Sequence, residues 1–392
     1  MIKRAVIDKI LSDIRGDKPL IRAIIGPRQV GKTTAARQIV EALEWPHIYE
    51  SADSPLPHKA EWITMHWHRA RKLAAVKPAL LILDEIQKIA NWSEEVKRLW
   101  DEDRNAKLPL TVLVLGSSAL LLAYGLTESL AGRFFSYHFT HWTWSEMKSA
   151  FGWSLDKWLY FGGYPGAADF CDDEDKWKHY VNDSLIETVL ARDVLQLQRI
   201  NKPALLRQLF GLSTTCHARI ISYNKMLGQL QDAGNTTTLA EYLRLLASSY
   251  LVVGLELFSK GVARKRASSP KIILLNNALI SAPSVETFKQ VLQFPDKWGW
   301  LIENAVGAHF YNSLSKTSWH ISYWRKGDKE VDFVVQGGDK IFGIEVKSGR
   351  LRKTSGLEAF KQQYPQAKTL LVGTTGIPLE EFFSAPAIEW LS

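Results

Sequence analysis

A glycine-containing loop near the start of the chain constrains the fold more than any other feature. Residues 26–33 read Gly-Pro-Arg-Gln-Val-Gly-Lys-Thr and satisfy the pattern G-x-x-x-x-G-K-[ST], between an apolar run at 20–25 and a helix-like run at 34–43. In this strand, loop and helix context, backbone N–H groups converge on phosphate oxygens at the positive end of the helix dipole. We expect Lys32 to neutralise phosphate oxygens and Thr33 to hold Mg²⁺. The residues expected to contact a nucleotide are Gly26, Pro27, Arg28, Gln29, Val30, Gly31, Lys32, Thr33 and Thr34.

A second apolar run ends in two acids and supports this interpretation. Residues 79–83 are all apolar, and Asp84 and Glu85 follow them directly. Such a run is typical of a buried parallel strand, and α/β sheets bind ligands at the carboxyl ends of these strands. We expect Asp84 to complete the Mg²⁺ shell and Glu85 to polarise the attacking water. The alternative is a strand end with solvated acids.

Two further segments carry candidate residues. An apolar strand at 110–115 leads into Gly116-Ser117-Ser118, which puts Ser118 at another strand end near the expected γ-phosphate, although serines at a turn are also ordinary turn chemistry. Arg133 follows the small-residue turn of 129–132. An arginine in such a place can stabilise transition-state charge in the same or a neighbouring subunit, and the sequence leaves that choice open.

Taken in order, these motifs resemble those of a family of bacterial and archaeal AAA-type ATPases of the AAA+ superfamily. The matching segments are residues 26–34, 83–87, 116–118, 129–133 and 162–165. The resemblance implies ATP hydrolysis and a C-terminal nuclease-like domain. It gives Lys32, Thr33, Asp84 and Glu85 the usual nucleotide roles, Ser118 a sensor-like role and Arg133 a finger-like role. Where relatives have Leu-x-Pro-Leu-Ser-x-x-Glu, this chain has His-Trp-Thr-Trp-Ser-Glu at 141–146 and lacks the proline.

The middle of the chain is expected to be helical and then to form a winged helix-turn-helix. Residues 176–200 show helical spacing, and Arg192-Asp193 within them resembles a charged pair of that family or forms a local ion pair. The sequence then predicts helices at 203–213, 226–232 and 237–249, a turn at 233–235, a threonine cap on the last helix, and an apolar run at 250–257.

The charge of this middle segment suggests DNA as a partner. Residues 201–271 hold ten Lys and Arg against three acids, a net +7 of the +8 of the whole chain. The second helix would enter a groove, and the arm at 260–266, with Arg264, Lys265 and Arg266, would meet phosphates. A solvated basic face, or a winged helix serving as a lid or oligomer contact, is the alternative.

The C-terminal part carries a second constellation of charged residues. We expect a helix at 299–314 with Glu303, and strands at 320–324, 330–335 and 341–347 that place Asp332, Glu345 and Lys347. Because side chains alternate along a strand, Glu345 and Lys347 share a face. Asp332 and Glu345, with Glu303, would chelate Mg²⁺ or Mn²⁺ beside a phosphodiester, and Lys347 would hold the water or the developing charge.

This constellation resembles the PD-(D/E)XK nuclease core, to which a helix at 357–364 and a strand at 369–372 also belong. The alternative is an inert nuclease fold, kept for binding or scaffolding, in which Glu345 and Lys347 form an ion pair.

These expectations combine into an α/β protein of three parts. They are an AAA-type P-loop ATPase at 1–165, a helical connector with a winged helix at 166–275, and a PD-(D/E)XK-like domain at 276–392. Two distant cysteines indicate a reducing, cytoplasmic setting, and the most apolar window, 108–124, is too short to span a membrane. The sequence predicts an ATP-driven, metal-dependent nuclease acting on DNA, and it leaves open whether the protein is a homo-oligomer. The alternative is a nucleotide-switched DNA-binding, assembly or scaffold ATPase with an inert nuclease-like domain.

Overall fold

The computed structural model divides the chain into two compact units, Met1–Thr140 and His141–Ser392. We call them unit 1 and unit 2 and treat each by itself. The structure describes residues 2–16, 18–116, 125–126, 129–194, 202–231, 234–259, 269–347, 349 and 355–392.

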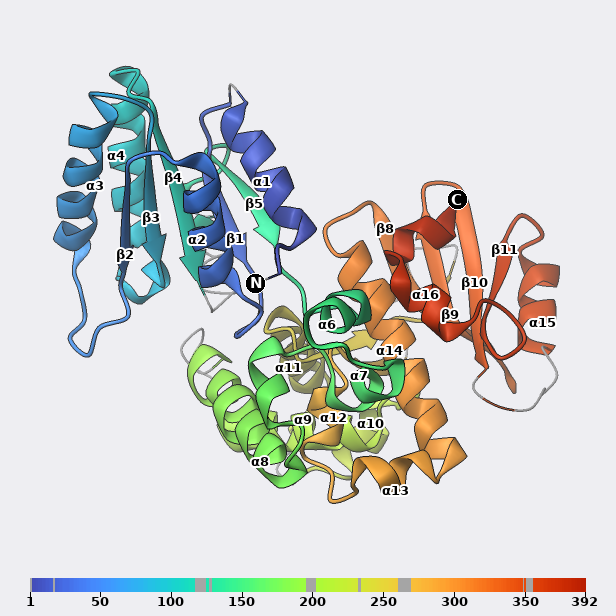
Figure 1. Cartoon of the computed structure of the whole chain (residues 1–392). Coiled ribbons are helices and arrows are strands. Elements are labelled where there is room, and N and C mark those ends of the chain that lie inside the picture. Colours follow the sequence, from blue (N-terminus) through green and yellow to red (C-terminus); the bar gives the residue numbers. More distant parts are fainter. Residues whose placement is uncertain are drawn as a thin grey trace. The chain divides into compact units, whose positions relative to one another are not determined.

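Unit 1 is built on a parallel sheet, as the sequence predicts, and this sheet has five strands (Figure 1). The strands are β1 (Ile21–Ile25), β2 (His47–Ser51), β3 (Ala79–Asp84), β4 (Leu110–Gly116) and β5 (Phe134–His138). Their order across the sheet is β2-β3-β4-β1-β5, and every neighbouring pair is parallel. β1 and β3 are buried along their whole length, which explains why β1 is apolar except for Arg22 and β3 is apolar up to Asp84. β4 separates the carboxyl ends of β1 and β3, where the candidate nucleotide residues lie.

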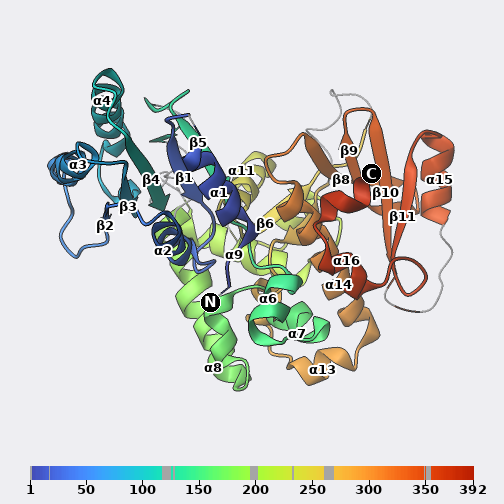
Figure 2. The ribbon, with the colours of Figure 1, turned by 45° about the horizontal axis from the view of Figure 1, so that its top comes forward.

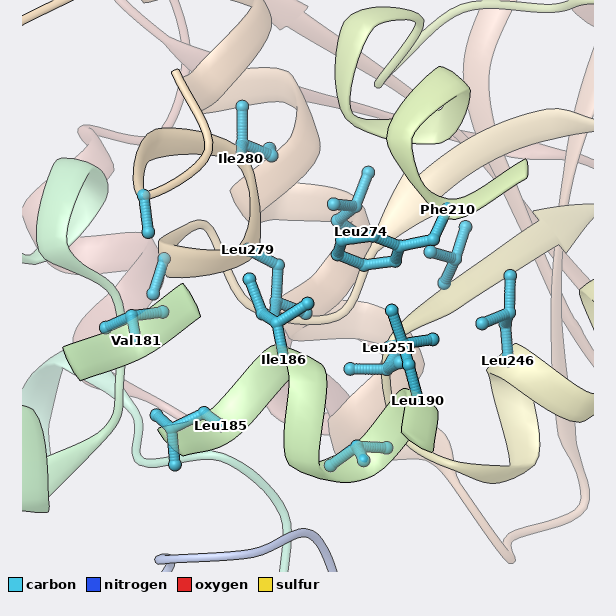
Figure 3. Packing of buried hydrophobic residues seen from close by; sticks show 14 of the residues in the cluster. Val181, Leu185, Ile186, Leu190, Phe210, Leu246, Leu251, Leu274, Leu279 and Ile280 are labelled. Atoms are coloured by element: carbon cyan, nitrogen blue, oxygen red, sulfur yellow. The ribbon is translucent and has the colours of Figure 1, made fainter. Parts of the chain in front are cut away.

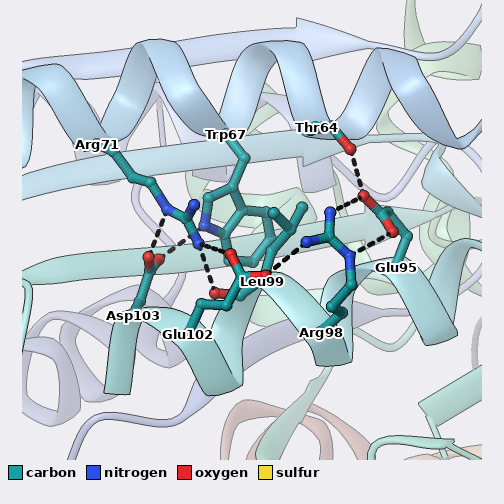
Figure 4. Close-up of polar contacts among 8 residues, drawn as sticks. All are labelled: Thr64, Trp67, Arg71, Glu95, Arg98, Leu99, Glu102 and Asp103. Atoms are coloured by element: carbon teal, nitrogen blue, oxygen red, sulfur yellow. Dashed lines mark hydrogen bonds and ion pairs between the residues drawn. The ribbon is translucent and has the colours of Figure 1, made fainter. Parts of the chain in front are cut away.

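Helices cover this sheet. They are α1 (Ala5–Arg15), α2 (Lys32–Leu43), α3 (Ala60–Ala74) and α4 (Trp92–Asn105). Alternate residues of β1, β3 and β4 pack in one apolar cluster with α3 and α4, whereas α1 and α2 contact each other. Figure 4 shows what joins α3 to α4: Trp67 Nε1 donates to Asp103 Oδ2 over 2.7 Å, and Arg71 Nη2 donates to the Leu99 carbonyl over 2.9 Å. A short helical turn, η1 (Ile86–Lys88), follows β3.

Unit 2 begins earlier than the sequence predicts. We expected the first boundary near 165, but α6 (Trp144–Phe151) and α7 (Leu155–Phe161) contact α16 (Leu379–Ser384) and α14 (Pro295–Leu314), respectively, so they belong to unit 2. The expected boundary near 275 falls inside one hydrophobic core, which runs in sequence from Met147 to Leu301. Residues 166–275 and 276–392 therefore form a single unit by contacts.

The core of unit 2 draws on helices from across this range. They include η2 (Pro165–Phe170), α8 (Glu174–His179), two π-helical segments, Tyr180–Glu187 and Val189–Val194, and α9 (Pro203–Thr215), α10 (Tyr223–Leu227), α11 (Thr236–Ser248), α12 (Ala278–Ser281) and α13 (Phe288–Leu292). Figure 3 shows Ile186 of the first π-helical segment beside Leu279, in the same cluster as Leu185 and Leu274. The predicted helical connector is thus helical in its described part, up to residue 194, and several of its apolar residues are buried in this core.

The segment predicted as a winged helix contains three helices and then two antiparallel strands, β6 (Val252–Leu255) and β7 (Lys271–Leu274). Two details of that prediction are wrong. The helix expected at 226–232 is α10, which begins earlier because the Ser222 hydroxyl caps it by accepting from Lys225 N. The cap of α11 is Asn235 rather than a threonine, and its Oδ1 accepts from Thr238 N over 2.9 Å. The basic arm at 260–266 lies outside the described residues, as does Ala233 of the expected turn.

A sheet of four strands completes unit 2, in the order β11-β10-β9-β8. The strands are β8 (Trp319–Lys326), β9 (Lys329–Gly337), β10 (Lys340–Lys347) and β11 (Lys368–Gly373), and all four match the predicted strands. Only β10 and β11 pair in parallel. α14 packs on one face and α15 (Ser355–Gln363) on the other, as Figure 2 shows. The chain ends in η6 (Ala387–Leu391).

Within the described residues, no helix has both the length and the apolar character needed to cross a membrane.

Candidate functional site: a P-loop in unit 1 and a carboxylate cluster in unit 2

The loop between β1 and α2 requires its two glycines. A Cβ on Gly26 would lie 2.2 Å from the carbonyl oxygen of Phe139, so no larger residue fits there. Gly31 caps α2 with a φ of 88°, a left-handed conformation that glycine adopts without strain. The sequence pattern therefore has a steric cause at both positions, and the loop closes onto the first turn of α2.

Lys32 is held inside this loop. Its side chain is buried, and Nζ donates to the Gly26 carbonyl over 3.0 Å and to the Pro27 carbonyl over 2.6 Å. The ammonium group thus lies among the main-chain atoms of the loop. This is the position from which it can neutralise phosphate oxygens bound by the loop.

Asp84, at the end of β3, is brought directly to Thr33. Thr33 Oγ1 donates to Asp84 Oδ2 over 3.0 Å, and Tyr49 on β2 donates its hydroxyl to the same oxygen over 2.7 Å. The backbone N–H of Glu85 donates to the other carboxylate oxygen over 2.9 Å. A hydroxyl and a carboxylate side by side form the donor set that a hard cation such as Mg²⁺ takes beside bound phosphates, so these residues fit the ion.

Tyr49 was not predicted from the sequence. Burial and its hydrogen bond to Asp84 raise the pKa of the Tyr49 phenol, so it stays protonated and donates to the carboxylate at neutral pH. A tyrosine on a neighbouring strand carries no sequence signal of this role. Only the β2–β3 pairing, in which Ser51 lies beside Asp84, reveals it.

Glu85 adopts an unusual backbone conformation, with a φ of 54°, which non-glycine residues rarely take. Gln87 Nε2 donates to Glu85 Oε2 over 2.7 Å. The amide of Gln87 in turn lies against the end of β4, where a Cβ on Gly116 would come within 2.2 Å of Gln87 Oε1. Gln87 thereby positions the carboxylate of Glu85 between the ends of β3 and β4, and Gly116 leaves room for it.

Arg133 lies far from this site within unit 1. It precedes β5, and its carbonyl accepts from the N–H of Ile21, the first residue of β1. The P-loop follows the last residue of β1, about 13 Å further along the sheet at about 3.3 Å per residue. Arg133 instead donates to both carboxylate oxygens of Asp101 on α4, over 2.8 and 3.1 Å. It is at the wrong edge of the sheet to act on the nucleotide of its own chain.

Two further sequence motifs were expected in this part of the chain, namely Ser118 and the segment at 141–146. Ser118 lies outside the described residues. In the segment that departs from the resembled family, Thr143 and Glu146 form a capping box that starts α6, and Ser145 donates to the Ser384 carbonyl over 2.9 Å. The serine and glutamate retained there are accounted for by capping and packing within unit 2.

In unit 2, the predicted E-x-K pair forms on β10. Lys347 Nζ donates to Glu345 Oε1 over 2.6 Å, which confirms that the two side chains share a face. Asp332 on β9 comes alongside, because Val346 N donates to Asp332 Oδ2 over 2.8 Å. Glu345 Oε2 is buried and has no hydrogen-bond partner among the residues that the structure describes, and burial together with the charge of Asp332 raises the pKa of Glu345.

A lysine that the sequence reading assigned to a basic surface lies in the middle of these acids. Lys271, the first residue of β7, is fully buried, and its Nζ lies 2.6 Å from Glu303 Oε1, 3.3 Å from Glu330 Oε1 and 3.4 Å from Asp332 Oδ1. We call these three acids and Lys271 the carboxylate cluster. Burial would lower the pKa of Lys271, but the three carboxylates outweigh it and raise that pKa, so the side chain is charged.

The expectation that Glu303, Asp332 and Glu345 chelate a divalent ion is therefore not met. Glu303 and Asp332 already bind an ammonium group, and Glu345 binds Lys347. In the described part of the chain, no three His, Cys, Asp or Glu side chains are grouped so as to hold a metal. The residues present do not fit Mg²⁺ or Mn²⁺ at this place.

Comparison with known families agrees with the geometry of unit 1. Residues 18–148 match the family described as "AAA domain". The P-loop, the Thr33–Asp84 pair and Glu85 all lie within this match, so the candidate nucleotide residues belong to the part of the chain that is similar to AAA domains. Residues 152–287 and 298–384 match two families described as "Domain of unknown function", DUF8612 and DUF4143.

Among curated proteins, the chain is similar to "Uncharacterized protein MJ1544" of Methanocaldococcus jannaschii, with 24% identity over 279 residues. The match covers 66% of this chain and spans 59% of the length of that relative.

Two solved structures have a distant likeness. The Walker-type ATPase paby2304 of Pyrococcus abyssi has 13% identity and a TM-score of 0.47, covering 72% of this chain and 95% of that one. The RuvB Holliday junction branch migration motor of Thermotoga maritima has 18% identity and a TM-score of 0.35, covering 68% and 92%. Both TM-scores are below 0.5, so we draw no conclusion from them.

Proposed function

We propose that this protein hydrolyses ATP with Mg²⁺ held at Thr33 and Asp84, and that it uses the nucleotide cycle to control DNA binding by unit 2. The observation that supports the first part is the convergence of the buried Lys32, the Thr33–Asp84 hydrogen bond and the Gln87-supported Glu85 at one edge of the sheet. When bound, Mg²⁺ would neutralise charge on the β- and γ-phosphates.

Glu85 is the group that we assign to the attacking water. Its carboxylate lies on a turn immediately after the residue that holds Mg²⁺, and the amide of Gln87 fixes one of its oxygens. The carboxylate would accept a hydrogen bond from water and orient it toward the γ-phosphate, while Lys32 and the loop N–H groups hold the phosphates. Water orientation by Glu85 distinguishes a hydrolysing site from one that only binds nucleotide.

Glu85→Gln tests this assignment. Removing the carboxylate charge while keeping its shape is expected to lower ATP turnover by about 10²-fold or more and to leave ATP affinity within a few-fold of wild type. Steady-state phosphate release and calorimetric ATP binding measure the two effects. Glu61→Gln, at an exposed position of α3, is the matched control. Equal turnover by the Glu85 and Glu61 variants would exclude Glu85 from the hydrolysis step.

DNA binding is supported by the order of elements in unit 2 and by charge. α10 and α11 are followed by the antiparallel strands β6 and β7, the order found in a winged helix-turn-helix. The chain between these strands contains Lys260, Arg264, Lys265 and Arg266, and Arg244 is exposed on α11. Basic residues at these places would contact phosphates, which makes binding salt-dependent and largely independent of sequence.

The triple change Arg264→Ala, Lys265→Ala and Arg266→Ala tests DNA binding. It is expected to weaken binding to duplex DNA at least tenfold at about 0.1 M salt and to flatten the dependence of log K on log salt. Lys316→Ala, Lys326→Ala and Lys329→Ala together remove the same charge from exposed positions elsewhere in unit 2 and serve as the control. If the triple variant and the control bind DNA equally well, these three residues are not the DNA contact. If wild type binds no DNA and DNA leaves ATP turnover unchanged, the protein acts as an ATP-regulated scaffold instead.

A metal-dependent nuclease is the activity that the sequence predicts first, with Glu303, Asp332, Glu345 and Lys347 as its residues. We do not assign this activity, because Lys271 occupies the space among Glu303, Glu330 and Asp332. Assembly into a homo-oligomer is part of the proposal for Arg133, which needs a nucleotide site on another copy of the chain.

A further inference from the structure

We propose that the ammonium group of Lys271 is the resident cation of the carboxylate cluster, in the place where a nuclease would hold a divalent ion. It follows that unit 2 binds no Mg²⁺ or Mn²⁺ there and does not cleave DNA. The inference depends on contacts within unit 2 alone, so it stands or fails separately from ATP hydrolysis and DNA binding.

The first support is the completeness of the contacts around Lys271. Three carboxylates from two elements, Glu303 on α14 and Glu330 and Asp332 on β9, all lie within 3.4 Å of Nζ. The ring of Phe333 adds a fourth contact, with its centroid 5.0 Å from Nζ. A primary ammonium has three protons to donate, and this site offers an acceptor for each of them.

The second support is that Lys271 cannot easily leave. It is fully buried, and its backbone belongs to the ladder in which it pairs with Leu255 of β6. On its other side it forms a bridge with Ile220. To admit a divalent ion, the ammonium would have to move out of the cluster while its main chain stays fixed. Keeping both cations would place like charges together in a buried site, which is strongly unfavourable.

The third support is that both oxygens of Asp332 and one oxygen of Glu345 are engaged within unit 2. Asp332 gives one oxygen to Lys271 and the other to the N–H of Val346. Glu345 gives one oxygen to Lys347 over 2.6 Å. The E-x-K motif thus closes on itself as an ion pair.

The position of Lys271 in the chain explains why the motif alone misleads. The acids belong to the region that matches DUF4143, residues 298–384, whereas Lys271 belongs to the region that matches DUF8612, residues 152–287. One matched region supplies the cation for the acids of the other. The cluster therefore serves as a link between two parts of unit 2 that are far apart in sequence.

Thermal unfolding of nucleotide-free, full-length protein tests the proposal. Lys271→Met leaves three partly buried carboxylates, with side chains 17–34% exposed, without a cation, so we expect the melting temperature of unit 2 to fall by roughly 10 °C. The double change Lys271→Met with Glu303→Gln removes one of the stranded charges and should recover part of that loss. Lys297→Ala, which breaks the partly exposed pair with Glu286, is the matched control and should shift the temperature by about 2 °C or less.

Metal addition provides the decisive comparison. In wild type, EDTA, Mg²⁺ and Mn²⁺ should give the same melting temperature. In Lys271→Ala, which leaves room beside the acids, Mn²⁺ should raise it and should appear as bound ion in electron paramagnetic resonance. The proposal is overturned if wild type gains as much from Mn²⁺ as Lys271→Ala, if Lys271→Met is as stable as wild type, or if wild type cuts plasmid DNA with Mn²⁺ and Lys347→Ala does not.

Discussion

His309 on α14 is a buried residue whose protonation should set the acid stability of unit 2. Its ring lies 5.3 Å from the ring of Phe382 and 5.4 Å from that of Phe383, and Nε2 donates to the Ala385 carbonyl over 3.0 Å. Burial lowers the pKa of His309 from 6.5 to about 4, and the hydrogen bond to Ala385 offsets part of this effect. The folded protein therefore keeps the ring neutral where the unfolded chain protonates it.

The sign of the effect follows from proton binding. Between pH 6.5 and 4 the unfolded state binds more protons at His309 than the folded state, so stability is present above pH 6.5 and is lost as the pH falls. We expect a loss of about 2 kcal/mol between pH 7 and pH 5 from this group alone. His309→Gln keeps a donor for Ala385 but does not titrate. Urea unfolding at the two pH values should therefore give a smaller pH-dependent loss in the variant, and an unchanged loss would contradict the assignment.

At the residue scale, the sequence predicted the P-loop site better than the carboxylate cluster. Lys32, Thr33 and Asp84 come together as expected because a continuous motif and an apolar strand determine where they lie. Tyr49 and Lys271 were missed because their roles depend on partners far away in sequence. Lys271 is the first residue of β7, and the other three residues of this strand are apolar. A lysine is expected to be buried only where acids surround it, and those acids lie far away in the sequence.

At the scale of elements, α14 is tied to β7 by a buried amide. Asn304 Oδ1 accepts from Leu274 N, and Asn304 Nδ2 donates to the Leu274 carbonyl, each over 2.9 Å. Nδ2 also donates to Asn277 Oδ1 over 2.9 Å. The Asn304 side chain thus makes the hydrogen bonds that a neighbouring strand would make with Leu274. Without it, the N–H and the carbonyl of Leu274 would be buried without partners.

Asn304→Ala should remove this link. We expect a loss of about 3 kcal/mol of unfolding free energy, because the backbone groups of Leu274 would stay buried without hydrogen-bond partners. Guanidinium unfolding followed by circular dichroism measures the change. Asn224→Ala, on an exposed part of α10, should have an effect within about 0.5 kcal/mol of zero. Similar stability of both variants would show that Asn304 contributes little.

The elements themselves were largely predictable. The apolar runs of β1, β3 and β4 and the alternation in β9 and β10 each have one dominant period, so strands were expected where they occur. Boundaries set by a single side chain were less predictable: the Ser222 and Asn235 caps fix the starts of α10 and α11. The extent of unit 2 was missed because α6 and α7 are assigned by contacts with elements late in the chain, which local patterns do not contain.

At the scale of the whole molecule, the position of Arg133 determines whether ATP hydrolysis needs a second copy of the chain. Its bidentate pair with Asp101 and its contact with the ring of Trp100 hold it at the edge of the sheet opposite the P-loop. A finger role therefore requires a nucleotide on another copy. We expect Arg133→Ala to reduce ATP turnover by about 10³-fold without changing ATP binding, and Arg104→Ala, at an exposed position of α4, to leave turnover unchanged.

Mixing two inactive variants tests the arrangement between copies. Glu85→Gln lacks its own water-orienting group but presents Arg133, whereas Arg133→Ala has Glu85 but presents no finger. In a randomly mixed cyclic assembly, one interface in four joins an intact Glu85 to an intact Arg133, so turnover should recover to about a quarter of wild type. Light scattering with a non-hydrolysable ATP analogue should show an oligomer under the same conditions. Because a finger acting within one chain gives no recovery on mixing, an inactive mixture of oligomeric variants would reject the role in trans.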